Sequence, residues 1–402
     1  MRGKIDIMVE QKQLPYFDYM FSAGVIIEDV IYFFTEKANV FMKMKIGDWK
    51  IECVDQFVLD NTDLHGKTDF LRVIGKKIYR LPLKGEHIDT FTLDNGLYNK
   101  IKVKSYNKEW DNFVAFEING KFLYVFPKWE REVFKIDSST NKLDSISLIL
   151  VQDRQNCNED FISFSCSFRD NNFLWLFEMR SQKTCIFDMN TDTYSFLNRP
   201  EEIMECTYFC KVDQLIYCMT LYNEIYVWNT QTNKCSQLWK EERYRDIEYY
   251  YWQFLVVNKK IIVLPGYGND IVIIDICSGT STQYVKYPKD FIYIDIKWAK
   301  YMNCFEDSRY YYYPMRLSEY LMTIDKQTGE IAWNKAIMSW DEKIRYLQKK
   351  LKIHPQILYE NQEQFVALIE IVNKWNDEIA KDRNLKITIG NMIWRNLKLL
   401  LA

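Results

Sequence analysis

The fold of this chain is decided by a six-residue stretch, Ile324-Asp325-Lys326-Gln327-Thr328-Gly329, and by its recurrence along the sequence. Each copy contains an apolar residue, Asp or Asn, two variable residues, Ser or Thr, and then Gly, Asn or Asp. Other clear copies begin at Ile136, Phe187, Trp228 and Ile274. A degenerate copy begins at Leu93-Asp94, and one more step back reaches Asp48. The steps between successive Asp or Asn positions are 46, 43, 51, 41, 46 and 50 residues, a period that predicts a repeat architecture.

The repeated stretch has the chemistry of a tight turn between two antiparallel strands. Asp or Asn at its head can accept a hydrogen bond from the backbone two residues later. Gly, Asn and Asp at its end tolerate the left-handed backbone that a type I turn with one bulged residue requires. The residues before the turn are rich in β-branched and aromatic side chains, as in Glu224 to Trp228 and Tyr320 to Ile324. Each copy therefore predicts a β-hairpin.

A second recurrence lies ten to twelve residues before the turn, at Leu81-Pro82, Phe126-Pro127, Leu264-Pro265 and Tyr313-Pro314. Proline cannot donate to a strand ladder, so it marks where a strand stops. A polar turn and another apolar strand precede each of these short strands, so each repeat is a four-stranded antiparallel meander. This pattern is typical of a β-propeller blade. The turn positions predict an all-β, seven-bladed propeller over residues 1–336; six or eight blades remain open because the first copy is weak.

The two ends of the chain have their own patterns. Residues Lys4 to Val9 alternate apolar and polar side chains, and we expect them to add a strand to the last blade and help close the ring. After Trp333 the period changes, and Ser339-Trp340-Asp341-Glu342 is typical of a helix start. We predict a helical extension over residues 337–402. Its apolar faces either pack on the propeller or dock a partner protein.

Composition narrows the class of partner. The chain has 402 residues, is 48% hydrophobic and 16% aromatic, and carries a net charge of −2. No global field draws it to nucleic acid or anionic lipid, so we expect neither a nucleic-acid partner nor a membrane. The ten cysteines form no framework of spacings, and no amino-terminal stretch resembles a signal peptide. We therefore expect a cytoplasmic protein with reduced thiols.

Some blades resemble known repeat families. The stretch Ile324 to Trp333 resembles the repeat of quinoprotein-like propellers, and Val227-Trp228-Asn229 resembles a WD40-like strand. The strands that end in proline resemble bacterial kelch-like repeats. These resemblances imply a rigid platform for protein binding, with the function set by the loops on its faces. Cofactor ligands of quinone enzymes do not carry over, because no matching motif accompanies the repeat.

The predicted turns all lie on one face of the ring, so the longer, chemically varied loops lie on the other, where binding residues tend to be placed. Two residues beyond the end of the second strand, every blade from the second to the seventh has an aromatic or basic residue. We predict ligand binding there by Lys84, Trp129, Arg180, Tyr222, Tyr267 and Arg316. The alternative is that these side chains cover neighbouring loops and pack blade edges.

Two further patterns favour structural roles. Acidic residues begin the third strand of several blades at Glu132, Glu224, Asp270 and Glu319. We expect their carboxylates to accept backbone N–H groups of adjoining loops, and a ring binding a cation or a basic peptide is the alternative. Tyr249 to Tyr251 with Trp252 form a dense aromatic run, which we expect to be core packing.

Catalytic patterns are weak. The three histidines, His65, His87 and His354, lie near no nucleophile motif, and we expect no catalytic residue, metal or cofactor. Paired carboxylates for carbohydrate chemistry could come from Asp153, Asp160, Asp246 or Asp290, but nothing selects two of them. The sequence favours a non-catalytic scaffold that binds a protein, peptide or glycan on its loop-rich face. The alternative is a hydrolase or lyase acting on a carbohydrate-like substrate in the central funnel.

Overall fold

The structure is a computed structural model. It describes residues 21–35, 40–54, 68–82, 87–103, 113–148, 163–179, 181–203, 206–244, 247–266, 268, 270–284, 286–289, 291, 303–315 and 318–351. The chain forms two units, Tyr19–Met338 and a second made of Met1–Asp18 with Ser339–Ala402. Within the described residues, no helix has both the length and the apolar character needed to cross a bilayer.

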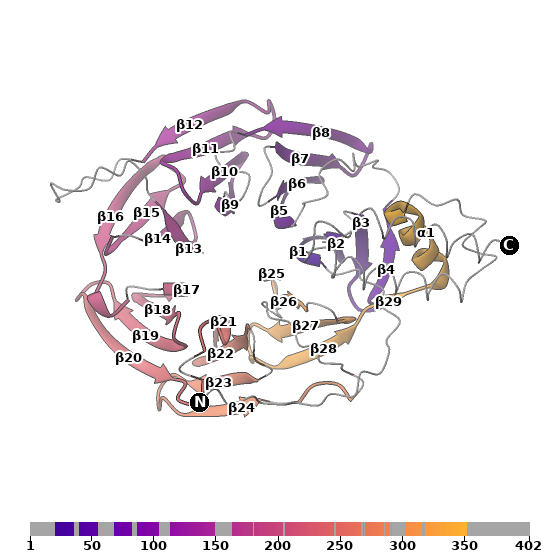
Figure 1. Ribbon diagram of the computed structural model, residues 1–402. Coiled ribbons are helices and arrows are strands. Elements are labelled where there is room, and N and C mark those ends of the chain that lie inside the picture. Colours follow the sequence, from indigo (N-terminus) through magenta and orange to yellow (C-terminus); the bar gives the residue numbers. More distant parts are fainter. Residues whose placement is uncertain are drawn as a thin grey trace, which may run out of the picture. The chain divides into compact units, whose positions relative to one another are not determined.

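The larger unit is a ring of seven antiparallel sheets (Figure 1). Blade 1 contains β1 (Phe21–Ile27), β2 (Val30–Thr35), β3 (Phe41–Lys45) and β4 (Lys50–Cys53). Blade 2 contains β5 (Thr68–Ile74), β6 (Lys77–Pro82), β7 (His87–Thr92) and β8 (Leu97–Lys102). Blade 3 contains β9 (Phe113–Asn119), β10 (Phe122–Pro127), β11 (Glu132–Asp137) and β12 (Leu143–Ser147). The first strand of each blade faces the centre of the ring.

The remaining blades repeat this order. Blade 4 contains β13 (Phe164–Asp170), β14 (Phe173–Glu178), β15 (Lys183–Asp188) and β16 (Thr193–Asn198). Blade 5 follows a short 3-10 helix (Glu201–Ile203) and contains β17 (Cys206–Val212), β18 (Leu215–Thr220), β19 (Glu224–Asn229) and β20 (Lys234–Lys240). Blade 6 contains β21 (Tyr251–Val257), β22 (Lys260–Pro265), β23 (Ile271–Asp275) and β24 (Ser281–Tyr284). Blade 7 contains β25 (Phe305–Glu306), β26 (Tyr310–Pro314), β27 (Tyr320–Asp325) and β28 (Ile331–Lys335).

The predicted turns are confirmed in their backbone geometry. In the five clear copies the last position has a positive φ of 51° to 72°, at Asn141, Asp192, Asn233, Gly279 and Gly329. The head residue also acts as expected, since the Asp137 carboxylate accepts the backbone N–H of Ser139 at 2.9 Å. The four prolines each end the second strand of a blade, as their missing N–H requires.

The first two turns lie in a different register from the one expected. In blade 2 the left-handed residue is Gly96, whose N–H donates to the Thr92 carbonyl at 3.0 Å. In blade 1 it is Trp49, whose N–H donates to Lys45 at 2.9 Å. The heads of these turns are therefore Thr92 and Lys45. The sequence pattern misplaces these two turns because Asp48 and Asp94, which resemble the first residue of the repeat, lie inside the turn.

Both hairpins of a blade lie on the same face, and backbone bonds join them. The residue after each turn head donates its N–H to the carbonyl of the neighbouring hairpin. In blade 3 the Ser138 N–H reaches the Lys121 carbonyl at 3.0 Å, and in blade 7 the Lys326 N–H reaches the Arg309 carbonyl at 2.9 Å. The hairpins therefore form a rigid structural face, as the sequence predicts.

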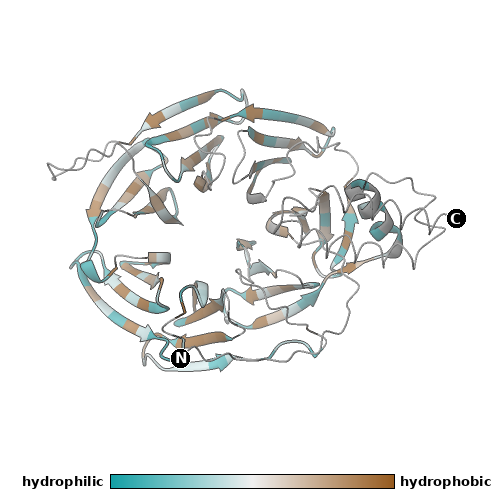
Figure 2. Cartoon of the chain, viewed as in Figure 1, coloured by the Kyte–Doolittle hydropathy of each residue, from teal (hydrophilic) through white to brown (hydrophobic). Residues whose placement is uncertain are grey.

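The core lies between neighbouring blades. The second strands are almost continuously buried, as in β10, while outer strands such as β12 alternate between exposed and partly buried positions. Figure 2 shows the corresponding hydrophobic colouring along the inner parts of the blades. Burying both faces of an inner sheet removes its apolar side chains from water, which drives the packing of one blade on the next.

Ring closure uses a strand from the end of the propeller. Strand β29 (Ile337–Met338) pairs in parallel with β4 and makes blade 1 five-stranded. The Ile337 N–H donates to the Trp49 carbonyl at 2.8 Å. The predicted strand at Lys4 to Val9 lies outside the described residues.

The second unit contains one described helix, α1 (Trp340–Leu351). The Glu342 N–H donates to the Ser339 hydroxyl at 3.3 Å, so Ser339 caps the helix where the sequence places its start. The later predicted helices, after residue 351, lie outside the described residues.

Candidate functional site: an aromatic platform on blades 5 and 6

Two of the six predicted ligand-binding residues are described. Trp129 follows β10 and is partly buried, with the Lys128 Nζ 5.5 Å from its ring centroid. Tyr222 lies between β18 and β19 and is 47% exposed. The other four lie outside the described residues, at Lys84, Arg180, Tyr267 and Arg316. Their gathering into one ring therefore stays a prediction.

The backbone beside Tyr222 is held by a buried asparagine. Asn223 is completely buried and has a φ of 62°. Its side-chain amide donates to the carbonyl oxygens of Ile247 at 2.7 Å and Tyr244 at 3.3 Å. Its side-chain oxygen accepts the backbone N–H of Tyr251 at 3.0 Å. One residue of blade 5 thus fixes the connection that leads into the innermost strand of blade 6.

Two glycines that follow β22 of blade 6 allow the backbone to pack closely against Tyr249 and Tyr250 of the same connection. A Cβ on Gly268 would lie 2.3 Å from the Tyr250 ring, and a Cβ on Gly266 would lie 2.4 Å from the Tyr249 carbonyl oxygen. Only a residue without a Cβ fits at either place. Tyr250 also stacks on the Tyr244 ring, with centroids 3.7 Å apart and planes 11° apart.

Four side chains project from this stretch of backbone and from the residue before Asn223. We name them the blade 5–6 platform: Tyr222, Ile247, Tyr249 and Trp252. Ile247 and Trp252 are each 43% exposed. Trp252 is the second residue of β21, and its ring centroid lies 5.5 Å from that of Tyr249. Large, rigid aromatic side chains offer contact area at a low cost in conformational entropy. The arrangement can therefore bind a ligand that presents apolar or stacking groups.

The aromatic run that supplies this platform is only partly buried, whereas the sequence predicted that all of it packs in the core. Tyr250 and Tyr251 are buried, at 9% and 1% exposure, as predicted for packing residues. Trp252 points the other way and is exposed, because successive side chains of a strand lie on opposite sides. The alternation along the strand was the signal that distinguished Trp252 from Tyr251.

An ion pair between the buried Glu241 and the exposed Arg243 lies in the same connection. The Glu241 carboxylate accepts hydrogen bonds from the Arg243 guanidinium at 2.9 and 3.0 Å and from the Tyr251 hydroxyl at 3.2 Å. Burial would raise the pKa of Glu241, but the bonds from Arg243 outweigh it and hold that pKa below its ordinary value. Arg243 also lies 3.9 Å from the Asp270 carboxylate. Two carboxylates therefore neutralise this one guanidinium.

Two of the four acidic residues at the start of the third strands, Glu224 and Glu319, form ion pairs with side chains, whereas we expected them to accept backbone N–H groups. Glu224 pairs with Lys240 at 3.1 Å, and Glu319 pairs with Lys335 at 3.6 Å, so the partners are side chains of the fourth strand. A carboxylate that does accept a backbone hydrogen bond is that of Glu178, to which the Ser163 N–H donates at 3.3 Å. Glu178 ends β14, a position that the sequence pattern did not mark.

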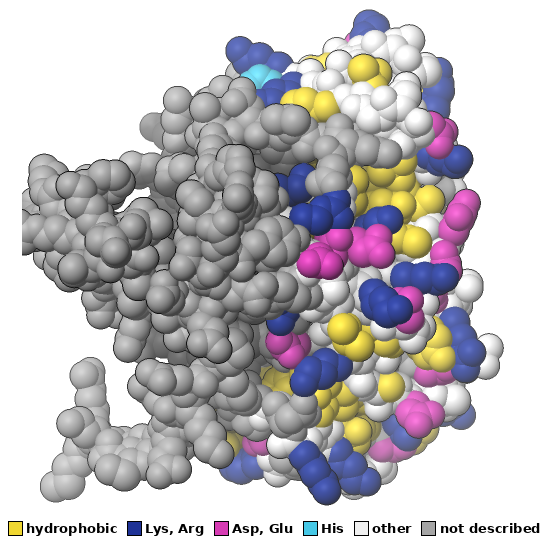
Figure 3. Space-filling view, turned by 90° about the vertical axis from the view of Figure 1, so that its right-hand side faces the viewer, with side chains coloured by type: hydrophobic (Ala, Val, Ile, Leu, Met, Phe, Trp, Pro, Cys, Tyr) yellow, Lys and Arg dark blue, Asp and Glu magenta, His cyan; other side chains and the backbone are white. Residues whose placement is uncertain are grey.

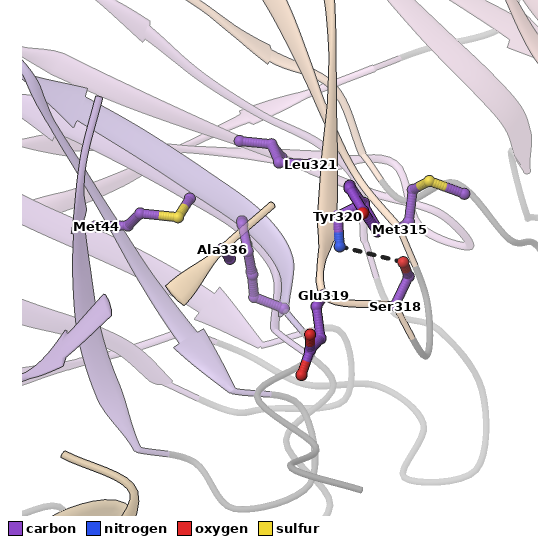
Figure 4. Close-up of a pocket in the computed structure, with 8 residues that line it drawn as sticks. Met44, Met315, Ser318, Glu319, Tyr320, Leu321 and Ala336 are labelled. Atoms are coloured by element: carbon purple, nitrogen blue, oxygen red, sulfur yellow. Dashed lines mark hydrogen bonds between the residues drawn. The ribbon is translucent and has the colours of Figure 1, made fainter. Parts of the chain in front are cut away.

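A pocket lies at the seam between blades 7 and 1 (Figure 4). Its empty volume is about 270 Å³, part of it open to solvent, and its walls are mainly apolar. They include Phe21, Met44, Met315, Leu321 and Ala336, with Ser318, Glu319 and Tyr320. The Ser318 hydroxyl accepts a hydrogen bond from the Tyr320 N–H at 3.1 Å.

Catalytic groups are not brought together in the described part of the chain. Groups of three or more His, Cys, Asp or Glu side chains able to hold a metal are absent from the described residues. His87 begins β7, and the carboxylates considered for carbohydrate chemistry lie outside the described ranges, at Asp153, Asp160, Asp246 and Asp290. On the side shown in Figure 3, basic and acidic side chains are interspersed over the described surface.

Comparison with known proteins gives the fold. No protein-family model matches the sequence, and no curated protein matches it. A streptogramin B lyase structure is similar, with a TM-score of 0.52 and 13% identity, over 80% of this chain and 95% of that chain. An inactive variant of virginiamycin B lyase from Staphylococcus aureus with quinupristin has a TM-score of 0.52 and 12% identity, over 80% and 96%.

A third similar structure is PorZ of Porphyromonas gingivalis, a bacterial surface component of the type-IX secretion system. Its TM-score is 0.51 and its identity 11%, over 80% of this chain and 39% of that chain. At such identities a likeness shows the fold alone. Together with the ring of seven four-stranded blades, these likenesses identify the larger unit of this chain as a β-propeller.

Proposed function

We propose that this protein is a non-catalytic interaction propeller that binds a protein, peptide or glycan through the blade 5–6 platform. The observation that carries the proposal is the exposure of Tyr222, Ile247 and Trp252, which adjoin stretches of backbone that the buried Asn223 joins by hydrogen bonds. Apolar side chains of this size are normally buried, and their clustering on a surface marks an interaction site.

The framework favours binding energetically. Tyr and Trp are the residues that most often dominate the free energy of binding at interfaces. Here their backbone is fixed before a ligand arrives, by the Asn223 hydrogen bonds and by the close contacts at Gly266 and Gly268. A preorganised surface loses little conformational entropy on association, so more of the contact energy appears as affinity.

A paired variant tests the proposal. The wild-type protein and the double variant Tyr222→Ala, Trp252→Ala are screened against a random-peptide display library and a glycan array. Phe173→Ala is the matched control, because Phe173 is 43% exposed but begins β14 in blade 4. We expect ligands that the wild type and the control retain and the double variant loses. The platform is refuted as the binding site if all three proteins bind the same ligands equally, or if the wild-type protein binds no ligand.

A further inference from the structure

We propose that the ligand of the blade 5–6 platform is cationic: an extended peptide segment that presents Arg or Lys side chains. This inference rests on the proposed function and adds the charge of the partner. It follows from the carboxylates that neighbour the platform residues along the chain and from the cation–π contacts that the protein makes elsewhere.

The connection that carries most of the platform has an excess of negative charge. Within residues 241–252 the described carboxylates are Glu241, Glu242 and Glu248, and the described cation is Arg243, which is already held by Glu241 and by Asp270. Glu242 and Glu248 are exposed and make no ion pair with another described residue. Two residues of the connection lie outside the described ranges, Arg245 and Asp246, and their charges cancel. Glu248 lies between Ile247 and Tyr249, within the platform itself.

The Trp252 ring is suited to a cation. Trp binds cations over its face better than Tyr or Phe does, and most strongly when the pair is removed from bulk water. The protein covers other rings with its own cations: Lys211 lies 5.6 Å from the Trp175 ring centroid, and the Arg243 guanidinium lies 5.2 Å from that of Tyr244. Among the described residues no Lys or Arg covers Trp252, although it is 43% exposed.

Charge separates the partner classes. An uncharged glycan stacks on the rings but gains nothing from Glu242 and Glu248. An anionic ligand approaches these carboxylates against Coulomb repulsion. An Arg side chain uses both features, since its planar guanidinium stacks on the indole and pairs with a carboxylate, as Arg243 does with Tyr244 and Glu241.

The test uses a defined probe. A capped peptide with three arginines separated by glycines is titrated into the full-length protein by calorimetry, and so is the same peptide with citrulline, which removes the charge and keeps the shape. We expect the arginine peptide to bind at least about tenfold more tightly and to lose affinity as NaCl is raised. Trp252→Ala weakens it about 5- to 30-fold and Trp252→Phe less. Glu248→Gln weakens it about 2- to 5-fold.

Two controls match these variants. Phe173→Ala removes an equally exposed aromatic ring from another blade, and Glu330→Gln removes an exposed carboxylate from the hairpin face of blade 7. Both leave the affinity unchanged. Equal affinities for the arginine and citrulline peptides, or an affinity that Trp252→Ala does not reduce, overturn the inference. If maltohexaose, cellohexaose or an acidic peptide binds through Tyr222 and Trp252 instead, the cationic ligand is wrong while the proposed function stands.

Discussion

Replacing Asn223 by alanine tests whether one buried side chain holds the connection between blades 5 and 6. The change removes the bonds to the Ile247 and Tyr244 carbonyl oxygens, at 2.7 and 3.3 Å, and to the Tyr251 N–H at 3.0 Å. It also leaves a residue with a Cβ at a φ of 62°, where asparagine is tolerated better than alanine.

The expected loss follows from these contacts. A buried donor or acceptor left without a partner costs about 1–3 kcal/mol, and the two shorter bonds of Asn223 each leave one such group. The left-handed backbone adds about 1 kcal/mol for alanine. We therefore expect Asn223→Ala to lower the free energy of unfolding by about 5 kcal/mol. Asn223→Gly loses the same bonds without the backbone strain and is expected to be about 1 kcal/mol less damaging.

Two measurements check this expectation. Urea unfolding followed by circular dichroism gives the free energy of unfolding of wild type, Asn223→Ala and Asn223→Gly. Hydrogen exchange reports the connection directly, since the Tyr251 amide loses its acceptor and should exchange roughly 100-fold faster. If both variants unfold within about 0.5 kcal/mol of wild type and the Tyr251 amide keeps its protection, the reasoning is refuted.

Three further outcomes are expected. Asp89→Leu removes the carboxylate 3.6 Å from the buried Arg80 guanidinium and should cost about 3–5 kcal/mol in urea unfolding, whereas Asp89→Leu with Arg80→Met should recover much of this loss. Equal losses in the two variants would contradict this expectation. Burial raises the pKa of the Cys185 thiol from 9.0 to about 12, so this thiol ionises at lower pH in the unfolded chain than in the folded one. The free energy of unfolding should therefore fall as the pH rises between these values, and Cys185→Ala should reduce the slope of that fall. An unchanged slope in the variant would contradict this expectation. Ile337→Pro removes the N–H that reaches the Trp49 carbonyl at 2.8 Å and should lower the melting temperature, whereas Ile337→Val should not; equal melting temperatures would show that β29 does not hold the ring closed.

The strand order and the turns were predictable because their causes are local. A positive φ at Asn141 or Gly329 is selected by the residue itself, and the missing N–H of Pro127 ends a strand whatever surrounds it. The first two turns were misplaced by an Asp at positions 48 and 94, since Asp is also common inside turns. Local chemistry identifies a turn more reliably than it identifies the turn's first residue.

The candidate site was predictable only in part. Tyr222 was selected by its position after a strand, and it is exposed. Trp252 was assigned to packing with its neighbours, because an aromatic residue in a strand can face either a core or water. Which side is buried depends on the blade packed against it, and that blade comes from a distant part of the sequence.

The sequence by itself predicted seven blades, with six or eight left open, and it determined their four-stranded order and the face that carries the hairpins, since each follows from the spacing of turn and proline residues. Only the tertiary structure decided how the ring closes, through β29 on β4, and how the platform forms. The platform requires Asn223, Tyr250 and Gly268 to meet from three separate stretches of chain. Such meetings depend on the packing of one blade on the next, which no local propensity encodes.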